Sequence, residues 1–197
     1  MSNQRSSIFG VGINDADYPV YVTKNKTVDG KNKVISKWEC NIYSTWRNLI
    51  MRCYCKSYQA KNKNYIGVTI CQEWLTFSNF RAWMVTQDYS GKHLDKDLLS
   101  GTHYSPETCI FIDPKVNYFI RDLRKPSGLS GACFDKSRNK WKADCSTAFG
   151  KKQQLGRFNT ELEAHQAWKT EKHKQAQILA SMQTDERVIN ALLTRYA

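Results

Sequence analysis

The residues best placed for chemistry lie in an alternating segment of the C-terminal third of the chain. In residues 140–146, polar groups occupy every second position: Lys140, Lys142, Asp144 and Ser146. The positions between them hold Trp141, Ala143 and Cys145. Strict alternation is typical of a β-strand with one buried and one exposed face. The exposed face therefore presents ammonium, carboxylate and hydroxyl groups side by side.

Neighbouring residues extend this polar face. We expect Lys152 and Gln154 to join it from the next strand, and Lys136 and Arg138 to flank it in the preceding turn. The lysines would neutralise phosphates, whereas Arg138, Asp144 and Gln154 would read base edges. A narrow antiparallel sheet fits the major groove of DNA. A merely solvated sheet face is the alternative interpretation, and the sequence leaves it open.

Three strands and one helix must position these residues. We predict strands at 128–134, 140–146 and 153–158, with turns at 135–139 and at Gly150. Thr160 and Glu163 then form a capping-box signature, which marks the start of a helix. Ala164, Ala167 and Trp168 follow at helical spacing. The expected structure is a three-stranded antiparallel sheet with one helix on its apolar face.

The chain as a whole is strongly basic. It has 197 residues, with 30 Lys+Arg, 18 Asp+Glu and a net charge of +12. Residues 124–182 hold twelve Lys/Arg and five Asp/Glu, so seven of the twelve net charges lie there. This concentration favours a nucleic-acid partner. No apolar run approaches the roughly 20 residues that cross a bilayer, and the N-terminus lacks a signal-peptide core. We therefore expect no membrane partner and a cytoplasmic location.

Seven cysteines form an odd number in a chain without a secretory signal. We expect reduced thiols, mostly buried as small apolar side chains. The alternative is a structural zinc ion held by scattered cysteines, since no CxxC pair is present. The cysteines are Cys40, Cys53, Cys55, Cys71, Cys109, Cys133 and Cys145.

Aromatic and apolar periodicity predicts three more helices. One covers 41–54 with Trp46, Ile50 and Cys53 on one face, and a second covers 73–84 through Trp74, Phe77 and Phe80. We expect Trp38, Trp46, Trp74 and Trp83 to lie in the core. A last helix begins near 184–187, and its apolar side either packs on the body or supports a homodimer. That side consists of Val188, Ile189, Leu192 and Leu193.

Residues 129–179 resemble an AP2 domain of the kind carried by phage endonucleases. The matching pieces are Gly-Ala-Cys-Phe-Asp-Lys at 131–136, Lys-Trp-Lys-Ala at 140–143, Leu-Gly-Arg-Phe at 155–158 and Thr-Glu-Leu-Glu-Ala-His-Gln-Ala at 160–167. In that family the sheet binds the major groove of double-stranded DNA. By position, the resemblance implies the same contact residues: Lys140, Lys142, Asp144, Ser146, Lys152 and Gln154. Several arginines and a tryptophan of the plant members are absent, so their base preference does not transfer.

Residues 8–123 resemble the HNH-related homing endonucleases of tailed phages. The matching stretches include Tyr-Ser-Thr-Trp-Arg-Asn at 43–48, Val-Thr-Ile-Cys-Gln-Glu-Trp at 68–74, Leu-Asp-Lys-Asp at 94–97 and Tyr-Ser-Pro-Glu-Thr-Cys at 104–109. Together the two resemblances imply an α+β fold. An HNH-like (ββα) domain would span 1–123, a linker 124–127, an AP2-like sheet packed on one helix 128–182, and a C-terminal helix 183–197.

The HNH resemblance also implies an active site. HNH enzymes activate water with a histidine beside one divalent ion. Here Lys96 stands at the expected histidine position and Thr108 near the central asparagine position. His93, two residues before Asp95, is a candidate base, and His103 is a second one. Asn117 matches the final residue, on the helix. Asp95 and Asp97 would hold Mg²⁺ or another divalent metal; the alternative is that they form a solvated strand end.

Three functions stay open at this point. The first is an HNH-type homing endonuclease that cuts or nicks double-stranded DNA. The second is a nuclease-inactive relative that needs no metal and acts as a sequence-specific repressor or phage-interference factor, which the missing histidine motivates. The third is an RNA-binding or structural protein. For a chain of phage origin, the location would be the cytoplasm of the bacterial host.

Overall fold

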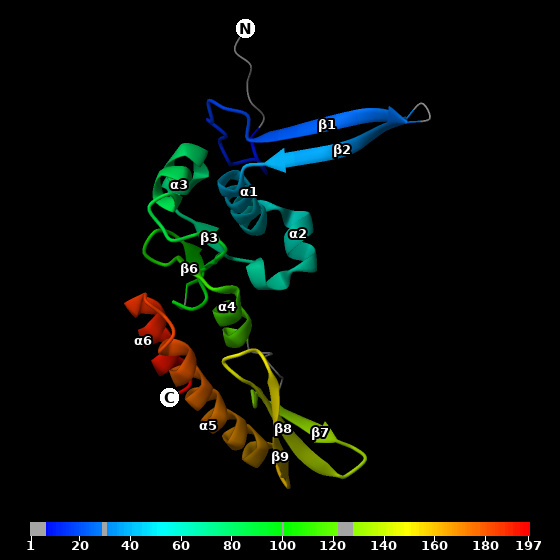
Figure 1. The fold of residues 1–197 in the computed structure, drawn as a ribbon, viewed down its shortest axis with the longest axis vertical. Helices are drawn as coiled ribbons and strands as arrows, with labels where there is room; N and C mark the ends of the chain where they lie inside the picture. Colours follow the sequence, from blue (N-terminus) through cyan, green and yellow to red (C-terminus); the bar gives the residue numbers. More distant parts are fainter. Residues whose placement is uncertain (1–6, 29–30, 100, 122–127) are drawn as a thin grey trace. The chain divides into compact units, whose positions relative to one another are not determined.

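A computed structural model describes residues 7–28, 31–99, 101–121 and 128–197. The protein is mixed α+β, with several small sheets (Figure 1). Its strands are β1 (Tyr21–Val28), β2 (Lys31–Glu39), β3 (Thr69–Ile70), β4 (His93–Asp95), β5 (His103–Tyr104), β6 (Ile110–Ile112), β7 (Ala132–Asp135), β8 (Lys140–Ser146) and β9 (Lys152–Phe158). Its helices are α1 (Asn41–Tyr54), α2 (Lys56–Lys61), α3 (Phe77–Met84), α4 (Pro114–Ile120), α5 (Glu161–Ala180) and α6 (Glu186–Arg195), with single turns of 3₁₀ helix η1 (Lys63–Tyr65) and η2 (Gln72–Leu75).

The chain divides into two compact units. The first comprises Met1–Ser90 and Ser100–Ile110, and the second comprises Gly91–Leu99 and Phe111–Ala197. The second unit therefore holds β4 and α4 as well as the sheet β7–β9. The linker predicted at 124–127 lies outside the described residues, and the domain bounds built on it stay a prediction.

An aromatic core organises the first unit. The predicted helix over 41–54 is confirmed as α1, and it buries Trp46 and Ile50 completely, at 0% exposure. The Trp46 indole nitrogen donates to the carbonyl of Trp74 over 2.7 Å. Phe77 lies 5.4 Å from the Trp46 ring, centroid to centroid. The predicted core positions Trp46 and Trp74 are thus confirmed, and the polar indole edge is satisfied.

The single helix predicted over 73–84 is wrong. The structure has η2, an extended Thr76 with φ −98° and ψ 128°, and then α3. The break has a tertiary cause, because Ile13 inserts beside Thr76. The Ile13 amide donates to the Leu75 carbonyl at 2.8 Å, and the Phe77 amide donates to the Ile13 carbonyl at 3.0 Å. These bonds replace those that a continuous helix would make.

The prediction of a buried Trp38 is also wrong. Trp38 lies on β2 with 53% of its surface exposed. Strands β1 and β2 pair as an antiparallel hairpin, seen as the long blue ribbon in Figure 1. Trp83 is half-buried, with its ring 4.4 Å from that of Trp74.

The second unit contains the predicted three-stranded antiparallel sheet, in the order β7-β8-β9. Strand β8 has the predicted bounds, whereas β7 begins at Ala132 and not at 128. Gly128 and Gly131 have φ of +73° and +80°, which are incompatible with a strand. Helix α5 packs on all three strands. Its capping box is confirmed, since Thr160 and Glu163 exchange both hydrogen bonds.

Helices α4 and α6 pack near the second half of α5. Lys172 of α5 is buried, and its ammonium donates to the Phe119 carbonyl at the end of α4. The same ammonium lies 3.6 Å from the Phe119 ring centroid and 5.3 Å from that of Tyr196. Helix α6 buries Val188 and Leu192 and contacts α5. The predicted C-terminal helix is therefore confirmed, and these two residues pack on the body of the protein.

Candidate nucleic-acid interface

The strand register gathers polar residues on one face of the β7–β9 sheet. Opposite residues of an antiparallel pair share a face. Lys142 lies opposite Cys133 of β7 and Arg157 of β9. In the same way Asp144 faces Gln154, and Ser146 faces Lys152. The register brings together the strand residues predicted from alternation: Lys140, Lys142, Asp144, Ser146, Lys152 and Gln154.

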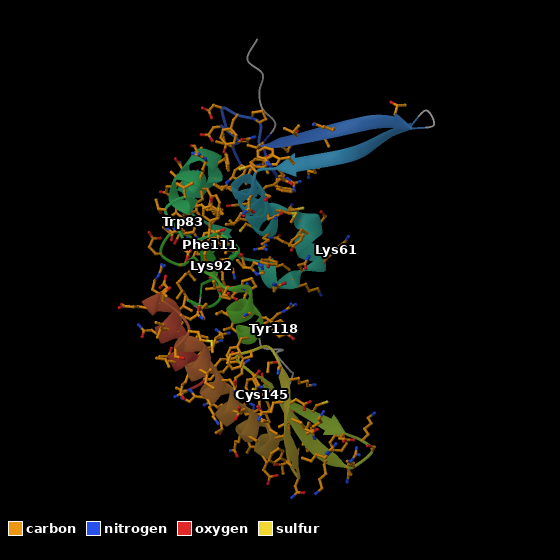
Figure 2. All side chains as sticks on the ribbon, in the orientation of Figure 1. Lys61, Trp83, Lys92, Phe111, Tyr118 and Cys145 are labelled. Atoms are coloured by element: carbon orange, nitrogen blue, oxygen red, sulfur yellow. The ribbon has the colours of Figure 1, made fainter. Side chains whose placement is uncertain are left out.

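The other face of this sheet is closed by α5. Ala132, Ala143 and Ala164 form its buried centre, at 0–1% exposure. Trp141, Leu155, Phe158 and Ala167 pack around them. Cys145, which is labelled in Figure 2, is 1% exposed. Burial of this face leaves the polar face as the one that can meet a partner.

Asp144 holds two lysines of the polar face in place. One of its carboxylate oxygens lies 3.0 Å from the ammonium of Lys142 and 3.0 Å from that of Lys152. Partial burial of Asp144 acts to raise the pKa of its carboxyl, but these two hydrogen bonds and charges lower it overall. The carboxylate is therefore ionised at neutral pH, and it fixes two cations on adjacent strands.

Asp135 does the same for two arginines at the other end of the sheet. Its carboxylate accepts hydrogen bonds from the Ser137 hydroxyl at 2.7 Å and from Arg157 Nε at 3.1 Å. A third, longer bond of 3.4 Å comes from Arg138. The hydroxyl and guanidinium donors lower the pKa of Asp135 to about 2. This ionised carboxylate ties the β7–β8 turn to β9.

The remaining predicted contact residues are exposed. Lys136 and Arg138 lie in the turn between β7 and β8, where Asn139 has a positive φ of 50°. Lys140 is exposed and donates to the Asn159 side chain just after β9. The turn and the first residue of β8 therefore present three basic groups at one end of the sheet.

Sequence reasoning missed Arg157. Strict alternation along β9 from Lys152 and Gln154 assigns Arg157 to the apolar face. The pairing shifts between Ala143 and Asp144, where β9 holds one extra residue. A bulge of this kind reverses the phase of the strand, so Arg157 lies opposite Lys142 on the polar face. Gly156, with φ of 136°, marks the irregularity and was the one available signal.

The residues predicted for catalysis lie on β4, on the loop after it and on α4. The His93 ring nitrogen Nδ1 lies 3.5 Å from the Asn117 side-chain nitrogen, so the structure brings these two residues together. His93 is exposed. Strands β4 and β6 pair, and α4 follows β6. Strand β5, which pairs with β3, lies between β4 and β6 in the chain, so the strand–strand–helix unit implied by the HNH resemblance stays a prediction.

The two carboxylates predicted as metal ligands are engaged separately. Asp95 is 8% exposed, and it accepts the Leu98 amide at 2.7 Å. Burial is the main cause that raises the pKa of this carboxyl. Asp97 pairs with the ammonium of Lys96. A shared divalent ion would have to compete with the Leu98 amide and the Lys96 ammonium. Within the described ranges, no group of three or more His, Cys, Asp or Glu is placed to hold a metal ion.

The second candidate base, His103, and the two histidines of α5 have structural partners. His103 Nδ1 lies 2.7 Å from the Thr69 hydroxyl, across the paired strands β5 and β3. The Thr108 hydroxyl donates to the His103 carbonyl at 2.6 Å. On α5, the His165 ring is 2.8 Å from the Ser130 carbonyl, and His173 lies 3.0 Å from the Gln177 amide. All seven cysteines are reduced, with none in a disulfide bond.

Comparisons with known proteins add no family. No family model, no curated protein and no solved structure matches the chain. Over the part of the chain that the structure describes, no helix is both long and apolar enough to cross a membrane.

Proposed function

We propose that the protein binds double-stranded DNA through the polar face of the β7–β9 sheet. One observation carries the proposal: the register gathers basic and amide groups on the face that α5 leaves open. A narrow antiparallel sheet has the width to enter the major groove. Fixed cations on such a face lose little conformational freedom when they meet phosphates.

The residues divide into two roles under this proposal. Lys136, Lys140, Lys142 and Lys152 neutralise phosphates and supply affinity. Arg138, Arg157 and Gln154 carry the donors and acceptors that read purine edges, and Asp144 can accept from a cytosine amino group. Ser146, the last residue of β8, adds a hydroxyl to this face. The ion pairs of Asp135 and Asp144 orient the cations before DNA arrives.

Charge reversal tests the surface directly. Lys140→Glu/Lys142→Glu should weaken duplex binding and reduce the salt slope by about one for each phosphate that is no longer neutralised. Fluorescence anisotropy with a labelled duplex over a salt series measures both quantities. Lys169→Glu/Lys174→Glu changes the same charge at exposed positions of α5 and serves as the control. Equal losses in both variants would show that only net charge matters.

Cys133 provides a probe in the unmodified protein. It is exposed and lies opposite Lys142 on the polar face. Bound duplex should slow its alkylation by a maleimide, measured by mass spectrometry of peptides. Cys55 of the first unit is the internal comparison. Hydrogen bonds from Ser57 and Tyr58 lower the pKa of its thiol, which favours the thiolate that the maleimide alkylates. Unchanged Cys133 labelling at saturating DNA would remove the sheet as the binding face.

Cleavage of the bound DNA is a second candidate function. The observation that favours it is the proximity of His93 and Asn117, which places an imidazole ring beside an amide. A supercoiled-plasmid assay with Mg²⁺ or Mn²⁺ should then show nicking that His93→Ala, Asn117→Ala and Asp95→Ala/Asp97→Ala abolish. Cutting that survives all three would disprove the site. Binding to a cognate site without any cutting would favour a repressor or interference factor.

A further inference from the structure

The β1–β2 hairpin is a second basic surface. It contains neither the strands of the β7–β9 sheet nor the candidate catalytic residues. It belongs to the first compact unit, whereas the β7–β9 sheet belongs to the second. Its strands contain five lysines, at 24, 26, 31, 33 and 37, against one acidic residue, Glu39. A solitary two-stranded ribbon is only marginally stable in water. The way these charges are distributed over its two faces therefore bears on its stability and on the partner it can bind.

The register sorts the charges onto one face. Val22 lies opposite Trp38, Lys24 opposite Ser36, Lys26 opposite Lys33, and Val28 opposite Lys31. Residues at every second position of β1, and the residues opposite them, share a face. Four lysine positions therefore share a face without an acidic residue. The bulge between Lys24 and Asn25 affects β2 and leaves the alternation of β1 intact.

The opposite face of the hairpin is balanced in charge. It carries Lys37 and Glu39, which form an ion pair of 3.0 Å. Its other register positions hold Tyr21, Thr23, Asn25, Thr27, Asn32 and Val34, which are uncharged. The net positive charge of the two strands thus belongs to the face of Lys24.

Two features of the lysine face indicate a partner. Like charges that gather on one face of a two-stranded ribbon destabilise it, and a polyanion would reverse that cost. At the base of the same face, Val22 is 44% exposed and Trp38 is 53% exposed. An exposed tryptophan beside lysines is typical of surfaces that meet the sugars and bases of nucleic acids.

We propose that the face of the β1–β2 hairpin that carries Lys24, Lys26, Lys31 and Lys33 binds the phosphate backbone of duplex DNA. It would be a contact surface additional to the β7–β9 sheet. The choice of duplex DNA rests on the proposed function, whereas the hairpin's affinity for a polyanion follows from its own register and charge. A two-stranded ribbon also has the width that a DNA groove admits.

The test uses the full chain and a labelled duplex of random sequence. Lys24→Gln/Lys33→Gln should lower the salt slope by about two and weaken binding on the order of tenfold in low salt. Lys56→Gln/Lys61→Gln removes the same charge from exposed positions of α2 and should change both quantities little. Circular dichroism and melting temperature check that each variant keeps the wild-type fold.

The outcomes separate the two proposals. If Lys140→Glu/Lys142→Glu weakens binding and the hairpin variant does not, the hairpin inference is overturned and the sheet proposal stands. If only the hairpin variant weakens binding, the sheet proposal fails and the hairpin inference stands. Wild-type protein that binds no duplex in low salt overturns both. A hairpin variant that loses affinity for anionic phospholipid vesicles but keeps its affinity for DNA also overturns the inference, because its polyanion is then a membrane.

Discussion

At the scale of single residues, Asp144 limits the charge that the sheet offers to DNA. Its carboxylate pairs with both Lys142 and Lys152, each at 3.0 Å, and offsets one of their two positive charges. We predict that Asp144→Asn strengthens binding to a random duplex several-fold and steepens its salt slope by about one, because the loss of one negative charge beside the phosphates outweighs the loss of order in the two lysines. Asp88→Asn, at an exposed position of the first unit, is the matched control. Weaker binding to random sequence would contradict the prediction.

Asp135 makes the stability of the second unit depend on pH. Its pKa of about 2 in the folded protein lies below the ordinary value of 3.8. A depressed pKa stabilises the fold above the unfolded value, and the contribution disappears as pH falls from about 4 towards 2. Asp135→Asn should therefore lower the melting temperature at neutral pH, and the difference from wild type should shrink over that window. A difference that stays constant with pH would assign the effect to packing.

At the scale of elements, one glycine lets α5 approach the sheet. A Cβ atom added to Gly131 would lie 1.9 Å from Cγ of the Trp168 ring, and its φ is +80°. We predict that Gly131→Ala lowers the free energy of unfolding by roughly 2 kcal/mol or more, from strain and overpacking together. Gly150→Ala has a similar φ of +77° but meets no atom within 4 Å. Chemical denaturation should show a clearly smaller loss for this control.

At the scale of the whole molecule, the cysteines report on both units at once. None of the seven forms a disulfide bond; Cys53, Cys109 and Cys145 are buried, and Cys133 is exposed. We predict that a reductant leaves the melting temperature unchanged, and that native alkylation modifies Cys133 long before the three buried thiols. Mass spectrometry of a labelling time course measures the order. Rapid labelling of Cys109 or Cys145 would contradict the described cores.

Much of the second unit could be predicted from local patterns. Alternation in 140–146 predicted β8 and its two faces, and the Thr160–Glu163 signature predicted the start of α5. Helix α1 also followed from periodicity. These predictions succeeded because side-chain period and capping depend on residues close together in the chain.

Other features depended on residues far apart in the chain. Ile13 interrupts the helix predicted over 73–84, a bulge moves Arg157 onto the polar face, and Trp38 lies exposed on a hairpin that periodicity did not predict. Each outcome depends on pairing or packing between separate segments, which no local window contains.

The amino-acid sequence by itself determined the basic charge, the alternating strand and the capped helix of this protein. Only the tertiary structure decided which groups share a surface: Arg157 with Lys142, His93 with Asn117, and four lysine positions on one face of the β1–β2 hairpin. The physical reason is register, because one shifted pair in a sheet moves every later side chain to the other face.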